Sequence, residues 1–107
     1  MNLSEYQYYA ARTINKDLTD REKELHALHL LSGEVGEVHS LYQKVYQGHP
    51  FSEDDLKKEI GDVLWGLAEL CTARGYSLGE VAQMNIDKLK KRYPDGFDAE
   101  HSLHRSE

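Results

Sequence analysis

Apolar residues recur at steps of three and four along most of the chain, the spacing that places them on one side of an α-helix. This spacing predicts four helices, whose ends are marked by prolines, glycines and capping residues. The expected ranges are about 4–14, 21–46, 53–74 and 78–92. No stretch alternates between apolar and polar residues for long enough to predict a strand. After Pro94 the helical pattern is lost, so residues 94–107 are expected to form an irregular C-terminal tail.

Polar residues at the expected helix starts support these limits. Ser4 with Gln7, and Ser77 with Glu80, have the spacing of a capping box. Ser52 precedes an acidic first turn, which complements the positive end of a helix dipole. We therefore expect residues 1–107 to form one all-α domain, a small domain resembling a four-helix bundle that dimerisation or tetramerisation completes.

The composition limits the kinds of partner. The 107 residues suit a single domain with a modest core. The 19 acidic and 13 basic side chains give a net charge of −6, which argues against nucleic acid or an anionic membrane as a partner. The N-terminal residues resemble neither a signal peptide nor a transit sequence, and no apolar run approaches the roughly 18 residues of a membrane helix. Together with the single cysteine, Cys71, this predicts a cytoplasmic protein.

Two similar pentapeptides place acids beside the apolar pattern: EVGEV, with Glu34 and Glu37, and EIGDV, with Glu59 and Asp62. In both helices the first acid lies at the edge of the apolar arc and the second lies about 60° beyond it. Two such helices packed side by side can bring all four carboxylates together, and a divalent cation would remove the resulting repulsion. Hard carboxylate ligands favour Mg²⁺, with Mn²⁺ as a substitute.

Either acidic pair alone is more often a solvated helix face than a site, but the repetition at the same angular offset favours a site. Gly36 and Gly61 lie within the two pentapeptides. A glycine inside a helix lowers stability by about 1 kcal/mol relative to alanine. Both glycines are therefore interpreted as points where a ligand or another backbone approaches closely.

The fourth predicted helix carries the opposite charge. Asn85, Lys88 and Arg92 flank its apolar arc at the offset that the acids use on their helices. Metal-binding acids beside an amide and two cations suit a metal-chelated polyphosphate. Taken alone, the two cations are more often ordinary residues of a last helical turn, where they complement the helix dipole.

Three stretches, GEVGEV, KKEIGDVLW and NIDKLKKRYPDGF, occur in this order. Together they resemble the MazG-like nucleoside triphosphate pyrophosphohydrolases of the all-α NTP pyrophosphatase superfamily, in the short single-domain form. The opening YQYYAARTIN and the closing GFDAEHSLHR are similar to that form too, so the likeness covers most of the chain. An ExxE pair alone is a weak signal, whereas the ordered set of ExxE, ExxD and N-x-x-K-L-x-x-R is specific.

The resemblance implies Mg²⁺ held by Glu34, Glu37, Glu59 and Asp62, in a dimer or a pair of dimers. The implied reaction is hydrolysis of a nucleoside triphosphate, often a deoxynucleotide, to the monophosphate and pyrophosphate, which cleans the nucleotide pool. Water attacks the α-phosphorus in this reaction, and Glu37 and Glu34 are the candidate catalytic carboxylates, with Glu37 as proton acceptor.

The same resemblance assigns contacts with the nucleotide. Lys88 and Arg92 would hold phosphate oxygens, and Asn85 would hydrogen-bond the substrate or a water. Lys44, on the acidic side of its helix, is a weaker phosphate candidate. Trp65 lies off the apolar arc, where it could stack on a base or anchor a dimer interface.

An alternative function stays open: a non-catalytic helical oligomerisation or adaptor protein with a structural divalent cation. For that protein Mg²⁺ would raise thermal stability and nucleotides would add nothing. The preferred base and sugar, modified nucleotides as substrates, the number of metal ions and the choice between dimer and tetramer are open as well.

Overall fold

The computed structural model describes residues 1–104, which form five helices. They are α1 (Leu3–Ala11), α2 (Asp20–Val45), α3 (Glu53–Arg74), α4 (Leu78–Arg92) and α5 (Ala99–Leu103). Within the described residues the only β-type pairing is an isolated bridge between Pro94 and Gly96. The prediction of an all-α fold is thus confirmed. In the same part of the chain, no helix combines the length and the apolar character needed to cross a membrane.

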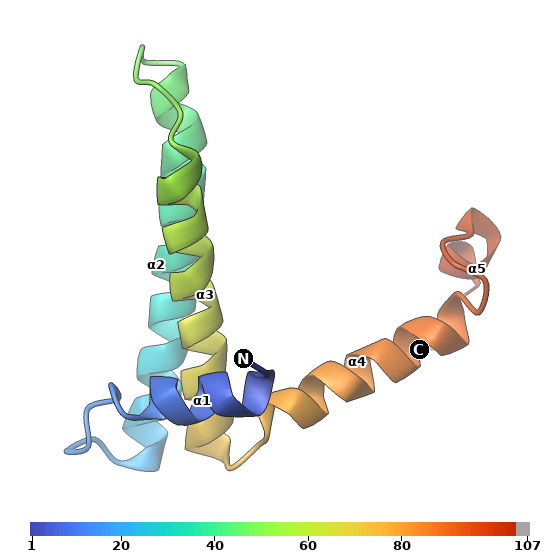
Figure 1. The fold of residues 1–107 in the computed structure, drawn as a ribbon, viewed down its shortest axis with the longest axis horizontal. Helices are drawn as coiled ribbons and strands as arrows, with labels where there is room; N and C mark the ends of the chain where they lie inside the picture. Colours follow the sequence, from blue (N-terminus) through green and yellow to red (C-terminus); the bar gives the residue numbers. More distant parts are fainter. Residues whose placement is uncertain (105–107) are drawn as a thin grey trace.

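A long antiparallel hairpin of α2 and α3 dominates the molecule (Figure 1). The helix α1 lies across the end of the hairpin where α3 finishes, and α4 leads away from that end, with α5 beyond it (Figure 1). Because α4 contacts α1 and α3 but does not lie along the hairpin, one chain does not close into a compact four-helix bundle.

Most helix limits agree with the sequence pattern. α3 and α4 have the predicted bounds, and α3 ends at Gly75, whose φ of 73° is the left-handed conformation favoured by glycine. The prediction of Ser4 as the cap of α1 is wrong. Asn2 caps this helix: its Oδ1 accepts a hydrogen bond from the Glu5 amide at 2.8 Å, and the Glu5 carboxylate accepts one from the Asn2 amide at 3.3 Å.

The C-terminal segment also differs from the prediction of an irregular tail, because residues 99–103 form α5. Asp98 caps this short helix by accepting a hydrogen bond from the Glu100 amide at 2.8 Å. The same carboxylate lies 3.2 Å from Nδ1 of His101. The prediction for residues 105–107 lies outside the described part of the chain.

The apolar core is small and lies where α1, α3 and α4 meet. Its buried residues are Ala10, Ala68, Cys71 and Leu78, with Tyr6, Leu64 and Trp65 packed against them. Cys71 is buried as expected, and burial raises the pKa of its thiol.

One side chain of α1 holds the corner between α3 and α4. Gln7 donates to the Tyr76 carbonyl at 2.9 Å and to Oγ1 of Thr72 at 3.2 Å, and its Oε1 accepts from the Leu78 amide at 2.8 Å. Gln7 thereby satisfies backbone groups at the end of α3 and the beginning of α4, and these bonds direct α4 away from the hairpin.

Much of the apolar arc expected to face a core is exposed in the single chain. Val35 on α2 is 45% exposed, and Ile60 on α3 is 55% exposed. Leu28, Tyr42 and Leu67 are similarly open. The physical reason is the direction of α4: a helix that leads away from the hairpin cannot cover the apolar faces of α2 and α3.

Candidate functional site

Three of the four acids singled out from the sequence lie together in the structure. Glu34 on α2 and Glu59 and Asp62 on α3 each offer a carboxylate oxygen, and these oxygens lie within 4.8 Å of one another. The antiparallel packing of α2 and α3 explains this, since each helix turns the same edge of its apolar arc toward one flank of the hairpin. We call these three residues the acid cluster.

The charges of the acid cluster are crowded. The pKa of Glu34 is raised, chiefly because its carboxyl is close enough to that of Glu59 for a proton to bridge them. Burial and the charges of Asp62, Glu59 and Glu37 add to this effect. Oε2 of Glu59 is buried and accepts no hydrogen bond within the described chain. A buried, unpartnered carboxylate oxygen among other carboxylates fits a hard divalent cation.

Glu37 lies outside this group of three. It is exposed, one helical turn beyond Glu34, and close enough for its charge to raise the Glu34 pKa. Its carboxylate is thus beside the acid cluster rather than within it.

The two glycines of the acidic pentapeptides are not points of close approach within the described chain. A Cβ built at Gly36 or Gly61 would meet no atom within 4 Å. The close contact between α2 and α3 falls at Gly66 instead, where a Cβ would lie 2.8 Å from Cδ2 of Leu31 and 2.9 Å from Cδ2 of Leu30. Within the described part of one chain, no other backbone therefore approaches Gly36 or Gly61 as closely as the sequence had suggested.

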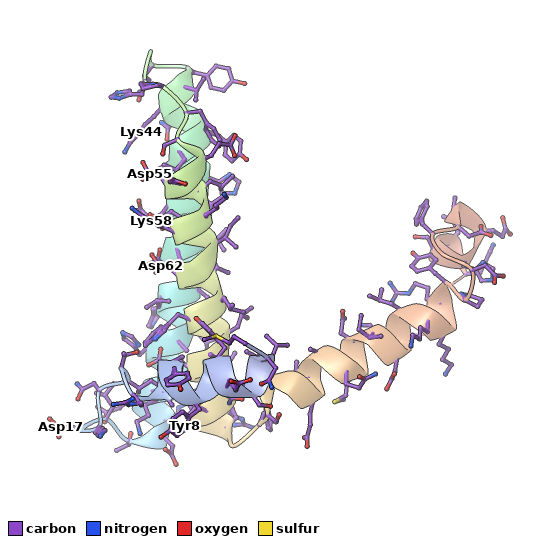
Figure 2. All side chains as sticks on the ribbon, viewed as in Figure 1. Tyr8, Asp17, Lys44, Asp55, Lys58 and Asp62 are labelled. Atoms are coloured by element: carbon purple, nitrogen blue, oxygen red, sulfur yellow. The ribbon has the colours of Figure 1, made fainter. Side chains whose placement is uncertain are left out.

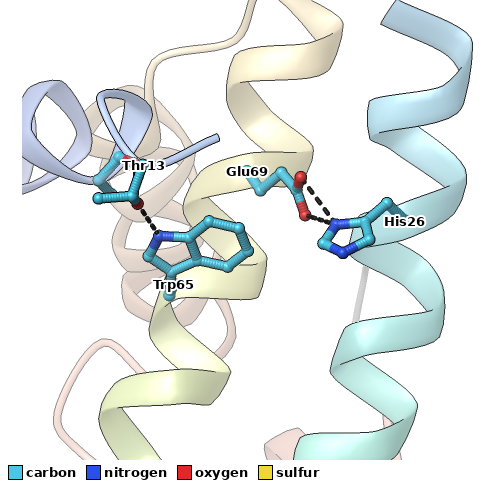
Figure 3. A network of polar contacts seen from close by, with 5 residues as sticks. Thr13, His26, Trp65 and Glu69 are labelled. Atoms are coloured by element: carbon cyan, nitrogen blue, oxygen red, sulfur yellow. Dashed lines mark hydrogen bonds and ion pairs between the residues drawn. The ribbon is translucent and has the colours of Figure 1, made fainter. Parts of the chain in front are cut away.

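A cleft of about 290 Å³ adjoins the acid cluster, with Leu30, Glu34, Asp62 and Trp65 as its lining. Trp65 is held at its wall by a 2.7 Å hydrogen bond from its indole Nε1 to Oγ1 of Thr13, in the turn that follows α1 (Figure 3). The cleft therefore has a carboxylate end and an aromatic wall, a combination that suits a ligand with both charged and flat apolar parts.

Lysines lie on the same flank as the acids. Figure 2 shows Lys44 of α2 and Lys58 and Asp62 of α3 projecting to one side of the hairpin. Lys44 was singled out from the sequence, whereas Lys58 was not. Lys58 precedes Asp62 by four residues, a spacing that places both on the same helix face. This spacing was the signal in the sequence that could have identified Lys58.

The α4 residues lie elsewhere. Asn85 and Lys88 line a separate groove of about 650 Å³, together with Tyr76, Val81 and Met84. Arg92 lies at the end of α4, with its guanidinium 5.8 Å from the centre of the Tyr93 ring. Since α4 leads away from the hairpin, one chain does not bring Asn85, Lys88 or Arg92 to the acid cluster (Figure 1).

Two further features were missed from the sequence. The pKa of Tyr6 is raised by burial and by the negative charge of Asp62, so α1 brings a phenol near the acids. Glu69 is only 1% exposed, and both of its carboxylate oxygens contact Nδ1 of His26, at 2.7 and 2.9 Å (Figure 3). The available signal for the second feature was an acid inside the apolar stretch LAELCTA.

Fold and site together define an all-α protein in which a helical hairpin carries a carboxylate cluster suited to a divalent cation, beside an aromatic-walled cleft. The chain belongs to the family of the MazG nucleotide pyrophosphohydrolase domain, whose model matches residues 11–97. The matched range contains the acid cluster, Trp65 and all of α4.

The chain is also similar to the Gene 37 protein of Mycobacterium phage L5, with 34% identity over 71 residues. This match covers 62% of the present chain and 62% of the phage protein, so the chain spans less than two thirds of its relative. No solved structure matches the chain.

Proposed function

We propose that this protein hydrolyses a nucleoside triphosphate, in particular a deoxynucleoside triphosphate of the cytoplasmic pool, to the monophosphate and pyrophosphate. The observation that carries the proposal is the convergence of Glu34, Glu59 and Asp62 beside a cleft with Trp65 at its wall, in a chain of the MazG family. The three carboxylates would hold Mg²⁺, or Mn²⁺ as its substitute. A bound divalent cation would neutralise phosphate charge and lower the pKa of water.

The hydrolysis itself needs an attacking water, a proton acceptor and groups that hold the phosphates. The oxygen of a water attacks the α-phosphorus, the bond between that phosphorus and the bridging oxygen breaks, and pyrophosphate leaves. Glu37, exposed at the edge of the acid cluster, accepts the proton from the water, and Glu34 is the alternative acceptor. Lys44 and Lys58 attract phosphate oxygens along the same flank.

We further propose that two or four copies assemble. The exposed apolar residues of α2 and α3, such as Val35 and Ile60, would pack against another copy, which removes them from water. In the assembly, α4 of one copy would bring Asn85, Lys88 and Arg92 toward the acid cluster of another copy. A stable monomer in a sizing measurement would contradict this part of the proposal.

The decisive experiment incubates the protein with each NTP and dNTP in the presence of Mg²⁺ and measures pyrophosphate and orthophosphate separately. We expect pyrophosphate from the wild type and a loss of at least about 100-fold in Asp62→Asn, the range expected when a key charge of a site is removed. Asp54→Asn is the matched control, because it makes the same change at an exposed position of α3 outside the acid cluster. Mg²⁺-dependent stabilisation without any pyrophosphate would favour the non-catalytic alternative.

A further inference from the structure

A buried carboxylate pairs with an exposed imidazole beside the cleft. Glu69 on α3 is 1% exposed, while the side chain of His26 on α2 is 49% exposed. Burial of a carboxylate is unfavourable unless it is paired, and an apolar pair of similar volume usually stabilises helix packing as well or better. Packing of α2 on α3 therefore does not by itself account for an acid at position 69.

The pair orients the histidine ring. Nδ1 of His26 donates to the Glu69 carboxylate at 2.7 Å, so the ring orientation is set by a group that cannot move into water. Figure 3 shows the second ring nitrogen, Nε2, turned away from Glu69. A carboxylate that holds one ring nitrogen and leaves the other free is the arrangement by which proteins present histidine to a ligand.

His26 lies behind the lining of the cleft, next to its wall residue Trp65. It precedes the cleft residue Leu30 by one helical turn, and its ring meets that of Trp65 edge to face, with centres 6.2 Å apart. Eight residues separate His26 from Glu34, a rise of about 12 Å along α2. This length is comparable with that of a nucleoside monophosphate.

The two ends of the cleft differ in charge and polarity. Beyond the acid cluster, away from His26, the hairpin carries the cations Lys44 and Lys58 on the side of Asp62, with the acid Asp55 between them (Figure 2). Toward His26 the lining becomes aromatic and apolar, with Trp65 and Leu30. Phosphates therefore suit the lysine end, and a flat base suits the end at Trp65.

Resting on the proposed function, we infer that His26, held by Glu69, is a specificity-determining residue that hydrogen-bonds the edge of the nucleobase. The base lies against Trp65, the α-phosphate lies at the acid cluster, and the β- and γ-phosphates extend toward Lys44 and Lys58. His26 thus selects among bases, whereas the acid cluster acts on phosphates that all nucleotides share.

The test compares His26→Ala with His29→Ala, an exposed histidine one turn away that makes no contact with Glu69 in the described structure. Steady-state pyrophosphate release is measured for every NTP and dNTP. We expect His26→Ala to lower kcat/KM for the best base about fivefold, the effect of losing one ordinary hydrogen bond, and to change the poorer bases less. Glu69→Gln should change the base ratios in the same direction by a smaller factor, and His29→Ala should leave them unchanged.

His26→Ala could instead lower kcat/KM equally for all bases, or lower the unfolding midpoint and leave the base ratios unchanged. Either result would overturn the inference and leave the proposed function standing. A second measurement is independent of turnover. The chain has one tryptophan, so quenching of Trp65 fluorescence reports binding of nucleoside monophosphates at the cleft. We expect quenching with a base preference that His26→Ala reduces. No quenching by any base, or a preference that the variant retains, would overturn the inference even if the wild type released no pyrophosphate.

Discussion

Gly66 of α3 lies directly against Leu31 of α2, because a Cβ at Gly66 would lie 2.8 Å from Cδ2 of Leu31. The absence of a side chain at this buried position lets leucines of α2 pack directly on the α3 backbone. This contact lies one residue after Trp65, so it also sets how closely the walls of the cleft approach each other.

Gly66→Ala should therefore destabilise the protein. Overpacking at a close contact costs about 1–3 kcal/mol, and the higher helix propensity of alanine offsets about 0.5–1 kcal/mol of that. We expect a net loss of about 1 kcal/mol in the free energy of unfolding, measured by urea denaturation. Gly33→Ala is the control: nothing lies within 4 Å of its Cβ position, so it should be neutral or stabilising. Equal effects of the two substitutions would contradict the packing shown here.

Replacement of Gln7 should loosen the joint between α3 and α4. Gln7→Leu removes the bonds to Thr72, Tyr76 and Leu78, at a cost of about 1–3 kcal/mol where backbone groups lose their partner. Hydrogen exchange at the Leu78 amide, followed by NMR, should accelerate. Gln83→Leu is the matched control, because within residues 1–104 the Gln83 side chain bonds to Asp87 alone, on the exposed surface of α4. Unchanged exchange at Leu78 in Gln7→Leu would show that another contact holds the corner.

Glu34→Gln should raise stability in the absence of a divalent cation and weaken the stabilisation that the cation gives. Without Mg²⁺ the variant should unfold at a higher temperature than the wild type, since it removes one crowded negative charge; like-charge pairs at helical spacing cost about 0.2–0.5 kcal/mol. At a Mg²⁺ concentration about 100-fold above its Kd, the free energy of unfolding should rise by about 2.7 kcal/mol in the wild type and by far less in the variant. Thermal unfolding with and without Mg²⁺ measures both effects. A variant that responds to Mg²⁺ as the wild type does would place the cation elsewhere.

The start of α2 should make stability depend on pH below the neutral range. The pKa of Glu22 is lowered from its ordinary 4.5, chiefly by the hydrogen bond from the Thr19 amide and then by that from the Thr19 hydroxyl. A lowered folded pKa means that the ionised Glu22 stabilises the fold above 4.5, and that this contribution is lost as the pH falls through the folded pKa. Urea midpoints of the wild type and Glu22→Gln should therefore differ at neutral pH and converge in acid. A difference that persists in acid would rule out the charge as its cause.

Local features of the sequence predicted the helices well because helix limits depend on nearby residues. The Ser52 and Ser77 caps and the stop at Gly75 mark the bounds of α3 and α4 in both the sequence and the structure. The start of α1 was misplaced because Asn2 with Glu5 and Ser4 with Gln7 offer competing capping patterns two residues apart, and Gln7 is used for tertiary contacts instead.

The sequence by itself determined the all-α class, and it placed Glu34 on one helix and Glu59 and Asp62 on another along the same side of the apolar arc, because both follow from helical periodicity. Only the tertiary structure decided the direction of α4, which depends on Gln7 bonding Leu78 across 71 positions of the chain. It also decided the pairing of His26 with Glu69 across 43 positions, and the close contact at Gly66. Such contacts arise when separate helices pack, and the spacing of residues within one helix carries no information about them.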